Sequence, residues 1–252
     1  MIWYNLFMKN ILLSIFLSSL LFSATAEQVE QYLSVSYSEE QLIELEEQFS
    51  LMQNNLNRDE NNVSTYDMEL LPIRFREYLQ KELSEDEMGD IIKAYRKVLL
   101  MRFISAQNDP EYDPKLAESY AKRMEQDADA ATRLELAEKI GNALYGKEDI
   151  GILFDNLMVP LMQNAPGGSK IDDGSLKKSR ENYIKMMEET GRIETIYATK
   201  DFTVEELDTL LKIVESPALQ HESRAVFGAT AYALKAFFLS ISSRYDLSKH
   251  QR

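Results

Sequence analysis

Three helix-start signals constrain the fold of this chain more than any other feature of its sequence. In each, a Ser or Thr is followed three positions later by Glu or Gln, and apolar residues flank the pair. In such a capping box the hydroxyl oxygen accepts a hydrogen bond from a backbone N–H of the first helical turn, and the Glu or Gln side chain reaches back to the N–H of the cap residue. The predicted pairs are Ser38 with Gln41, Ser84 with Glu87, and Thr203 with Glu206. We interpret them as helix caps and not as catalytic groups.

The rest of the chain also has the pattern of helices. Apolar residues recur at steps of three and four, glycine and proline are sparse, and no alternating strand pattern stands out. The sequence therefore predicts an all-α fold, a helical bundle of about eight or nine helices. The clearest expected helices cover 84–103, 114–144, 150–162, 176–197, 204–214 and 217–241. The segment 150–162 is apolar on nearly all sides, so we expect it to be buried centrally, with Pro160 bending it.

An internal repeat suggests how the helices are grouped. Residues 83–93 align with residues 202–212, and in both places a capped amphipathic helix follows an apolar stretch and a linker. We interpret this as two related helical halves, residues 27–125 and 126–252, packed together. Chance convergence of two capped helices is the alternative. The seam between the halves is expected near 150–162, and the residues predicted to line a guest site along it are Phe154, Leu157, Met158 and Met162.

The N-terminal 26 residues have the pattern of a secretory signal peptide. Lys9 supplies a positive charge, residues 11–22 form a short apolar core, and Ala24 and Ala26 give a small-x-small cleavage site before Glu27. A membrane anchor is the alternative, but the apolar core is shorter than the roughly 20 residues that a spanning helix needs. We therefore expect residues 1–26 to be cleaved, a periplasmic or secreted protein, and no stable membrane span after cleavage.

Composition excludes several classes of function. The chain has 28 Lys and Arg against 42 Asp and Glu, a net charge of −14, so it lacks the basic surface that binds nucleic acid. It has no Cys, which excludes thiol chemistry and cysteine-held metals, and its only His residues are His221 and His250. The loop acids at 109–113 and 172–173 lack the spacing of a calcium loop. We predict no catalytic residue, no cofactor and no metal.

The second half resembles the domain-of-unknown-function 2059 family, small exported bacterial helical domains. The residues that carry the resemblance are 133–138 (RLELAE), 202–207 (FTVEEL) and 215–217 (ESP), within a match over about residues 131–240. The sequence departs from the family pattern at Ile213 and Val214, where an aromatic pair is usual, and at Ala218 and Leu219, where Gly is usual. The first half looks like a diverged copy. The resemblance implies an all-α fold and an envelope location, and it implies no activity.

These observations favour a non-enzymatic envelope protein that binds an unknown protein or an apolar guest between its halves. Two alternatives remain open at this point: a carboxylate-dependent hydrolase acting in the periplasm, and a purely structural helical module. The first hypothesis predicts an enclosed apolar cleft. A hydrolase would have two or three convergent acids or amides in a cleft, with raised pKa values, and a structural module would have neither.

Overall fold

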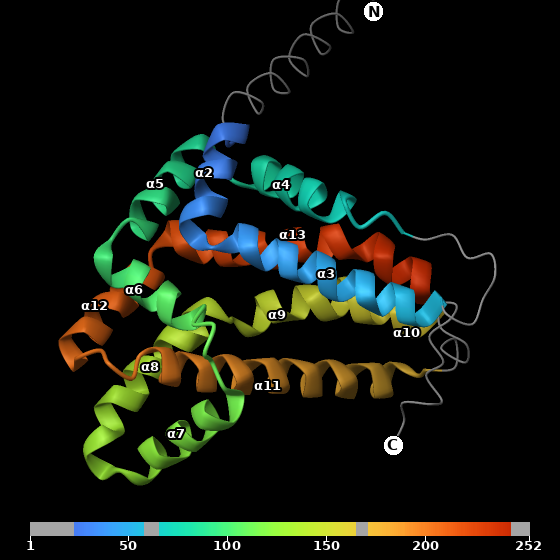
Figure 1. Cartoon of the computed structure of the whole chain (residues 1–252). Helices are drawn as coiled ribbons and strands as arrows, with labels where there is room; N and C mark the ends of the chain where they lie inside the picture. The colour runs from blue at the N-terminus through green and yellow to red at the C-terminus, as the bar shows by residue number, and fades with distance from the viewer. Residues whose placement is uncertain (1–22, 58–65, 165–170, 243–252) are drawn as a thin grey trace, which may run out of the picture.

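A computed structural model describes residues 23–57, 66–164 and 171–242 of the chain (Figure 1). Within these ranges the fold is all-α and contains no strand. They form eleven helices when the continuous segment Lys147–Asn164 is counted once, more than the eight or nine expected. The helices are α2 (Ala26–Ser36), α3 (Ser38–Asn57), α4 (Leu70–Glu82), α5 (Glu85–Tyr95), α6 (Val98–Gln107), α7 (Pro114–Gln126), α8 (Ala131–Leu144), α9 (Lys147–Leu153), α10 (Val159–Asn164), α11 (Asp173–Ala198), α12 (Val204–Val214) and α13 (Pro217–Ser242).

Two of the three predicted capping boxes are present. Ser84 opens α5 and Thr203 opens α12, and in both the hydroxyl oxygen accepts the third N–H while the Glu side chain accepts the N–H of the cap residue. A further box, which the sequence analysis missed, opens α2: Thr25 accepts from the N–H of Gln28, and the Gln28 side chain accepts from the N–H of Thr25. The reciprocal bonds fix where these helices begin.

The predicted box at Ser38 is wrong. Helix α2 turns directly into α3 through Tyr37, whose φ of 59° is left-handed. The Ser38 hydroxyl accepts from the Ser36 hydroxyl, and the Ser38 N–H donates to that same Ser36 oxygen at 3.3 Å. Gln41 therefore does not receive the Ser38 N–H, and its side chain donates to Asn108 at 3.0 Å. Position 38 is a helix start, but the tight turn before it leaves no room for a separate cap residue.

Two expected long helices are broken, which accounts for the larger number of helices. The stretch 84–103 divides at Lys97, whose backbone is extended with ψ of 128°. The stretch 114–144 divides at Asp127, which is extended and accepts a hydrogen bond from the N–H of Asp129 at 3.0 Å. Apolar periodicity continues across both breaks, so periodicity alone did not reveal them.

The apolar segment Lys147–Asn164 lies between α13 and α11 (Figure 1). Its middle, Phe154–Met158, is a π-helical turn, which is a common way for a helix to accommodate a following proline such as Pro160. Burial is confined to one face, with Ile150, Phe154, Leu157 and Leu161 inside. The segment thus has the central position that its apolar composition predicts, with one face buried and its other apolar side chains partly buried.

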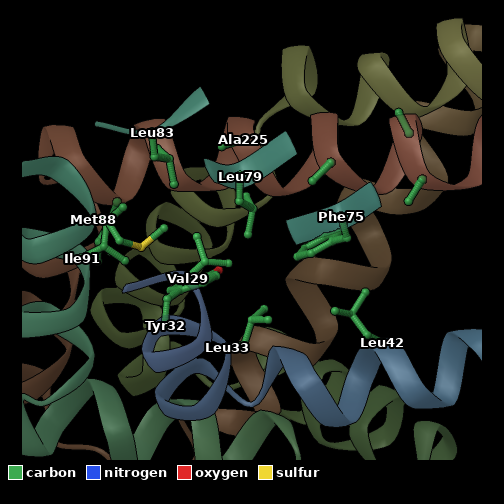
Figure 2. Packing of buried hydrophobic residues seen from close by; sticks show 14 of the residues in the cluster. Val29, Tyr32, Leu33, Leu42, Phe75, Leu79, Leu83, Met88, Ile91 and Ala225 are labelled. Carbon is green, nitrogen blue, oxygen red and sulfur yellow. The ribbon is translucent and has the colours of Figure 1, made fainter. Parts of the chain in front are cut away.

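The core joins elements from both ends of the chain. Figure 2 shows Phe75 and Leu79 of α4, and Leu83 just after it, packing toward Val29 and Leu33 of α2, with α13 behind them. Helix α13 packs along α4, while α7 packs against α11. The final helix of each proposed half thus contacts the other half. The division of the fold into two related halves stays a prediction.

The repeated helices bury matching faces. In α5 these are Met88, Ile91 and Ile92, and in α12 they are Leu207, Leu210, Leu211 and Val214, as the repeat predicts. Tyr95, also expected on the buried face, is partly exposed. Shared caps and shared faces are what two copies of one unit would have, and they are also what two independently evolved capped helices would have.

The predicted leader boundary lies within the packed fold. Residues 1–22 lie outside the described ranges, but Ser23 pairs with Ser84, the N–H of Ala24 donates to the carbonyl of Leu83 at 2.9 Å, and Ala24 is 1% exposed. Together with the Thr25 cap, these contacts show that residues 23–26 take part in the fold. These four residues also belong to the predicted leader, so the leader pattern and the fold overlap there.

Among the described helices, α13 meets the length and apolarity of a membrane span over Pro217–Ile241. Half of this window is buried against the rest of the protein. A central helix of a folded core has the same composition.

Candidate ligand pocket

A pocket of about 170 Å³ lies where α3, the end of α6, the end of α8 and the last turns of α11 meet. We call it the tyrosine pocket. Its lining is aromatic and polar, and differs from the apolar seam predicted from the sequence. The lining residues are Gln41, Ala106, Gln107, Asn108, Tyr112, Tyr145, Glu194 and Tyr197.

Helix α11 supplies the floor of the pocket. Glu194 and Tyr197 are three residues apart, so they project from the same face. One turn earlier, Gly191 allows the Tyr145 ring to lie directly on the helix backbone: a Cβ at position 191 would be 2.7 Å from the Tyr145 Cδ2 atom. The end of α11 is held by Arg133, whose guanidinium donates to the carbonyl oxygens of Thr199, Lys200 and Phe202.

The tyrosine rings form the walls of the pocket. The rings of Tyr112 and Tyr197 meet edge to face, with 5.9 Å between their centroids. The Tyr145 hydroxyl accepts a hydrogen bond from the Gln107 side chain at 3.1 Å. Burial, followed by the nearby charge of Glu194, raises the pKa of Tyr145 to about 12. Because burial also raises the pKa of Tyr112, both Tyr112 and Tyr145 offer neutral aromatic surfaces at ordinary pH.

Glu194 is the charged group of the pocket. Its carboxylate makes no hydrogen bond or ion pair with any residue that the structure describes, and burial raises its pKa. Its charge contributes to raising the pKa of Tyr112, after the larger effect of burial. An unpaired, partly desolvated carboxylate is unfavourable, and a cation beside it would relieve the cost.

Three amide side chains complete the lining. Gln41 donates to the Asn108 side-chain oxygen at 3.0 Å, and Asn108 donates to the carbonyl of Ile104 at 2.8 Å, which joins α3 to the end of α6. With Gln107 bound to Tyr145, each amide is held by a neighbour through its N–H group. Their positions are therefore fixed before any ligand arrives.

The four residues predicted to line a guest site lie elsewhere. Phe154 is buried against Tyr183, Leu157 is buried in the main core, and Met158 and Met162 are partly buried. None of them lines the tyrosine pocket. None lines either of two surface grooves, one between residues 132–136 and 204–209 and the other between residues 23–26 and 77–81. The predicted seam site stays a prediction.

The other groups weighed in the sequence have structural roles. Asp172 accepts from Ser175 as the cap of α11, and Asp113 accepts from the N–H of Lys115 as the cap of α7. The His221 ring nitrogen Nδ1 lies 2.8 Å from the Glu87 carboxylate, next to the box of α5. Within the described ranges no group of three acids or histidines is placed to hold a metal. His250 lies outside these ranges.

Sequence reasoning missed every residue of the tyrosine pocket. The lining comes from four separate stretches, and none contains a motif. The one usable signal was glycine inside helices: Gly191, which admits Tyr145, and Gly141, where a Cβ would lie 3.3 Å from the Thr195 hydroxyl on α11. In the sequence Gly141 has the pattern of a loosened helix end, whereas in the structure it allows α8 to approach α11 closely.

Comparison with known proteins adds no assignment: no family model, no curated protein and no solved structure matches this chain. The resemblance to the domain-of-unknown-function 2059 family therefore stays a prediction. The function has to be argued from the site alone.

Proposed function

We propose that this protein is an exported, non-enzymatic binding module whose ligand site is the tyrosine pocket. The observation that carries the proposal is the pocket lining: three tyrosines, three amides and one unpaired carboxylate around about 170 Å³. Aromatic walls with a few placed polar groups are the usual composition of a small-molecule site.

Binding fits this lining better than hydrolysis does. A two-carboxylate mechanism needs a second acid within about 10 Å on the other side of the substrate. Glu194 is the one carboxylate among the eight lining residues, and the lining contains no serine, threonine or histidine to act as a nucleophile or base. The raised pKa of Glu194 and the three amides match part of what is expected of a hydrolase site. The second catalytic group that such a site needs, an acid, a base or a nucleophile, is missing from the lining.

Export is proposed from the leader pattern and the family resemblance. Expression of the full chain followed by cell fractionation and N-terminal sequencing tests it. We expect the protein in the envelope fraction or the medium. Recovery in the cytoplasm with residues 1–22 intact would contradict export and leave the pocket argument unaffected.

Filling the pocket tests the binding site. Ala106 lines it, whereas its neighbour Ser105 is exposed. In an NMR fragment screen of the wild-type protein, we expect hits that shift the resonances of Tyr112, Tyr145 and Tyr197. Ala106→Leu should abolish these shifts while circular dichroism shows an intact fold, and Ser105→Leu should preserve them. Hits that bind both variants equally would place the site elsewhere, and conversion of a hit during incubation would indicate an enzyme.

A further inference from the structure

We propose that the ligand of the tyrosine pocket is a small organic ammonium ion, an inference that rests on the binding function proposed above. Four features carry it: a carboxylate without a counter-ion, aromatic faces, unused acceptor atoms and the size of the space.

The carboxylate of Glu194 lacks a cationic partner inside the fold. Other acids of comparable exposure are paired: Glu206 binds Arg102, and Glu138 lies near Arg192. Glu194 has no such neighbour among the described residues, and its main electrostatic effect is on the hydroxyls of Tyr112 and Tyr145. A ligand cation would supply the missing charge in a partly desolvated space, where the attraction is stronger than in water.

The tyrosine rings favour the same charge. An aromatic face carries negative potential, and cages of such faces recognise alkylammonium groups. Tyr197 already attracts a cation of the protein, since the Lys200 ammonium lies 3.9 Å from its ring centroid. Lys200 is not among the residues that line the pocket.

Two side-chain amide oxygens of the lining are unused acceptors. The side-chain N–H groups of Gln41 and Gln107 donate within the protein, to Asn108 and Tyr145. Within the described ranges their carbonyl oxygens accept nothing, and neither does Glu194. A pocket with free acceptors and a negative charge complements a ligand that brings donors and a positive charge. An anionic guest would be repelled by the Glu194 carboxylate.

The size limits the ligand to a small molecule. A cavity of about 150 Å³ is known to hold benzene, so the 170 Å³ of this pocket suits roughly six to eight non-hydrogen atoms. Choline and ethanolamine derivatives are in this range, whereas a peptide or a nucleotide is too large to enter.

The decisive experiment compares molecules of equal shape and different charge. Isothermal titration of the purified full-length protein would use choline, its neutral isostere 3,3-dimethylbutan-1-ol and the anion 3,3-dimethylbutanoate, with ethanolamine as an N–H-bearing cation. We expect choline or ethanolamine to bind at least about ten-fold more tightly than the neutral isostere, and the anion not to bind. Equal affinity for choline and its isostere would overturn the inference, as would binding of the anion.

Matched variants connect the charge preference to the pocket. Glu194→Gln should weaken binding of the cation about ten-fold and leave that of the neutral isostere unchanged. Glu181→Gln removes the same charge from an exposed position on α11 and should change neither affinity. Tyr112→Phe keeps the ring and should keep the affinity, whereas Tyr112→Leu should lose it about five-fold or more. If the two glutamate variants behave alike, the charge preference does not come from this pocket.

The outcomes separate this inference from the proposed function. Fragments that occupy the pocket without a preference for positive charge would leave the binding module standing and overturn the ammonium ligand. If Ala106→Leu has no effect on any binding, the site assignment fails first, and the inference fails with it.

Discussion

The hydroxyl of Tyr32 donates a hydrogen bond of 2.6 Å to the carboxylate of Glu222, a residue 190 positions away along the chain. Tyr95 donates to the same carboxylate oxygen, also at 2.6 Å, so α2, α5 and α13 meet at one buried acid. Burial raises the pKa of Glu222 to about 7, against the opposing effect of the two tyrosine hydrogen bonds. The junction is therefore a place where the protonation of one group affects the stability of the fold.

We expect stability to depend on pH through Glu222. A carboxyl whose folded pKa is raised contributes stability that is present below its unfolded pKa, near 4.5, and is lost as pH rises through about 7. The free energy of unfolding in urea should fall over this range by an amount on the order of 3 kcal/mol. Glu222→Gln should remove this part of the pH dependence.

A glutamate with the opposite shift provides the control. Hydrogen bonds from Arg102 hold the pKa of Glu206 at about 2, so Glu206→Gln should leave the slope between pH 4.5 and 7 unchanged. The junction would have no linkage to pH if the wild-type protein and Glu222→Gln had parallel pH profiles.

Two buried threonines, Thr195 in α11 and Thr199 at its C-terminal cap, should respond oppositely to the same substitution. Thr195 is 0% exposed, and its hydroxyl has no hydrogen-bond partner among the described residues. Thr199, 1% exposed, donates to the Thr195 carbonyl at 2.7 Å. Thr195→Val should therefore leave stability unchanged or raise it, whereas Thr199→Val should cost about 1 kcal/mol in chemical denaturation. Equal losses would mean that the Thr195 hydroxyl has a partner.

Two helical glycines should also differ. A Cβ at Gly89 in α5 would have no atom within 4 Å, so Gly89→Ala should stabilise the protein by about 1 kcal/mol through helix propensity. Gly191→Ala would place a carbon 2.7 Å from the Tyr145 ring and should destabilise the protein by about 1–3 kcal/mol. It should also displace the Tyr145 resonances in NMR spectra. A gain in stability at position 191 would show that Tyr145 does not lie against α11.

The cap of α12 should contribute measurable stability. The Thr203 hydroxyl oxygen accepts from the N–H of Glu206 at 3.2 Å, so Thr203→Ala should cost about 1 kcal/mol in urea denaturation. Thr209, exposed on the same helix, serves as the control, and Thr209→Ala should be neutral or stabilising. A loss of only a few tenths at Thr203 would argue that α12 begins elsewhere.

The first described residues should stabilise the fold. A chain that starts at Glu27 lacks the Thr25 cap and the buried Ala24, and we expect it to be less stable by about 1–2 kcal/mol than a chain that starts at Ser23. Thermal unfolding of the two purified proteins measures the difference. Identical stability would make residues 23–26 dispensable.

Local sequence signals predicted helix starts well where the interaction that fixes the start lies within one short stretch of the chain. The caps at Ser84 and Thr203 depend on side chains three positions apart, so the sequence contains the whole interaction. The breaks at Lys97 and Asp127 were missed because apolar spacing runs through them. At position 127 the residue type could have indicated a new helix start, since Asp is a favoured cap. In the structure Asp127 does accept the N–H of Asp129.

The tyrosine pocket could not be predicted in the same way. Tyr112, Tyr145 and Tyr197 come together only because α6, α8 and α11 converge, and this convergence depends on packing across the whole chain. Phe154, predicted to line a guest site along the seam, is buried. A buried residue fills space and does not by itself create a cavity.

The pairing of Ala24 with Leu83 would impose an order on the predicted leader cleavage and on folding. A protease that cuts after Ala26 needs these residues extended and accessible, yet in the folded protein they pair with the turn before α5 and cap α2. If the predicted leader is cleaved at that bond, cleavage therefore has to precede the docking of α2 onto α5, and a chain that folds first would keep residues 1–26. The relative speed of these two steps would then decide how much of the protein is released and how much stays tethered.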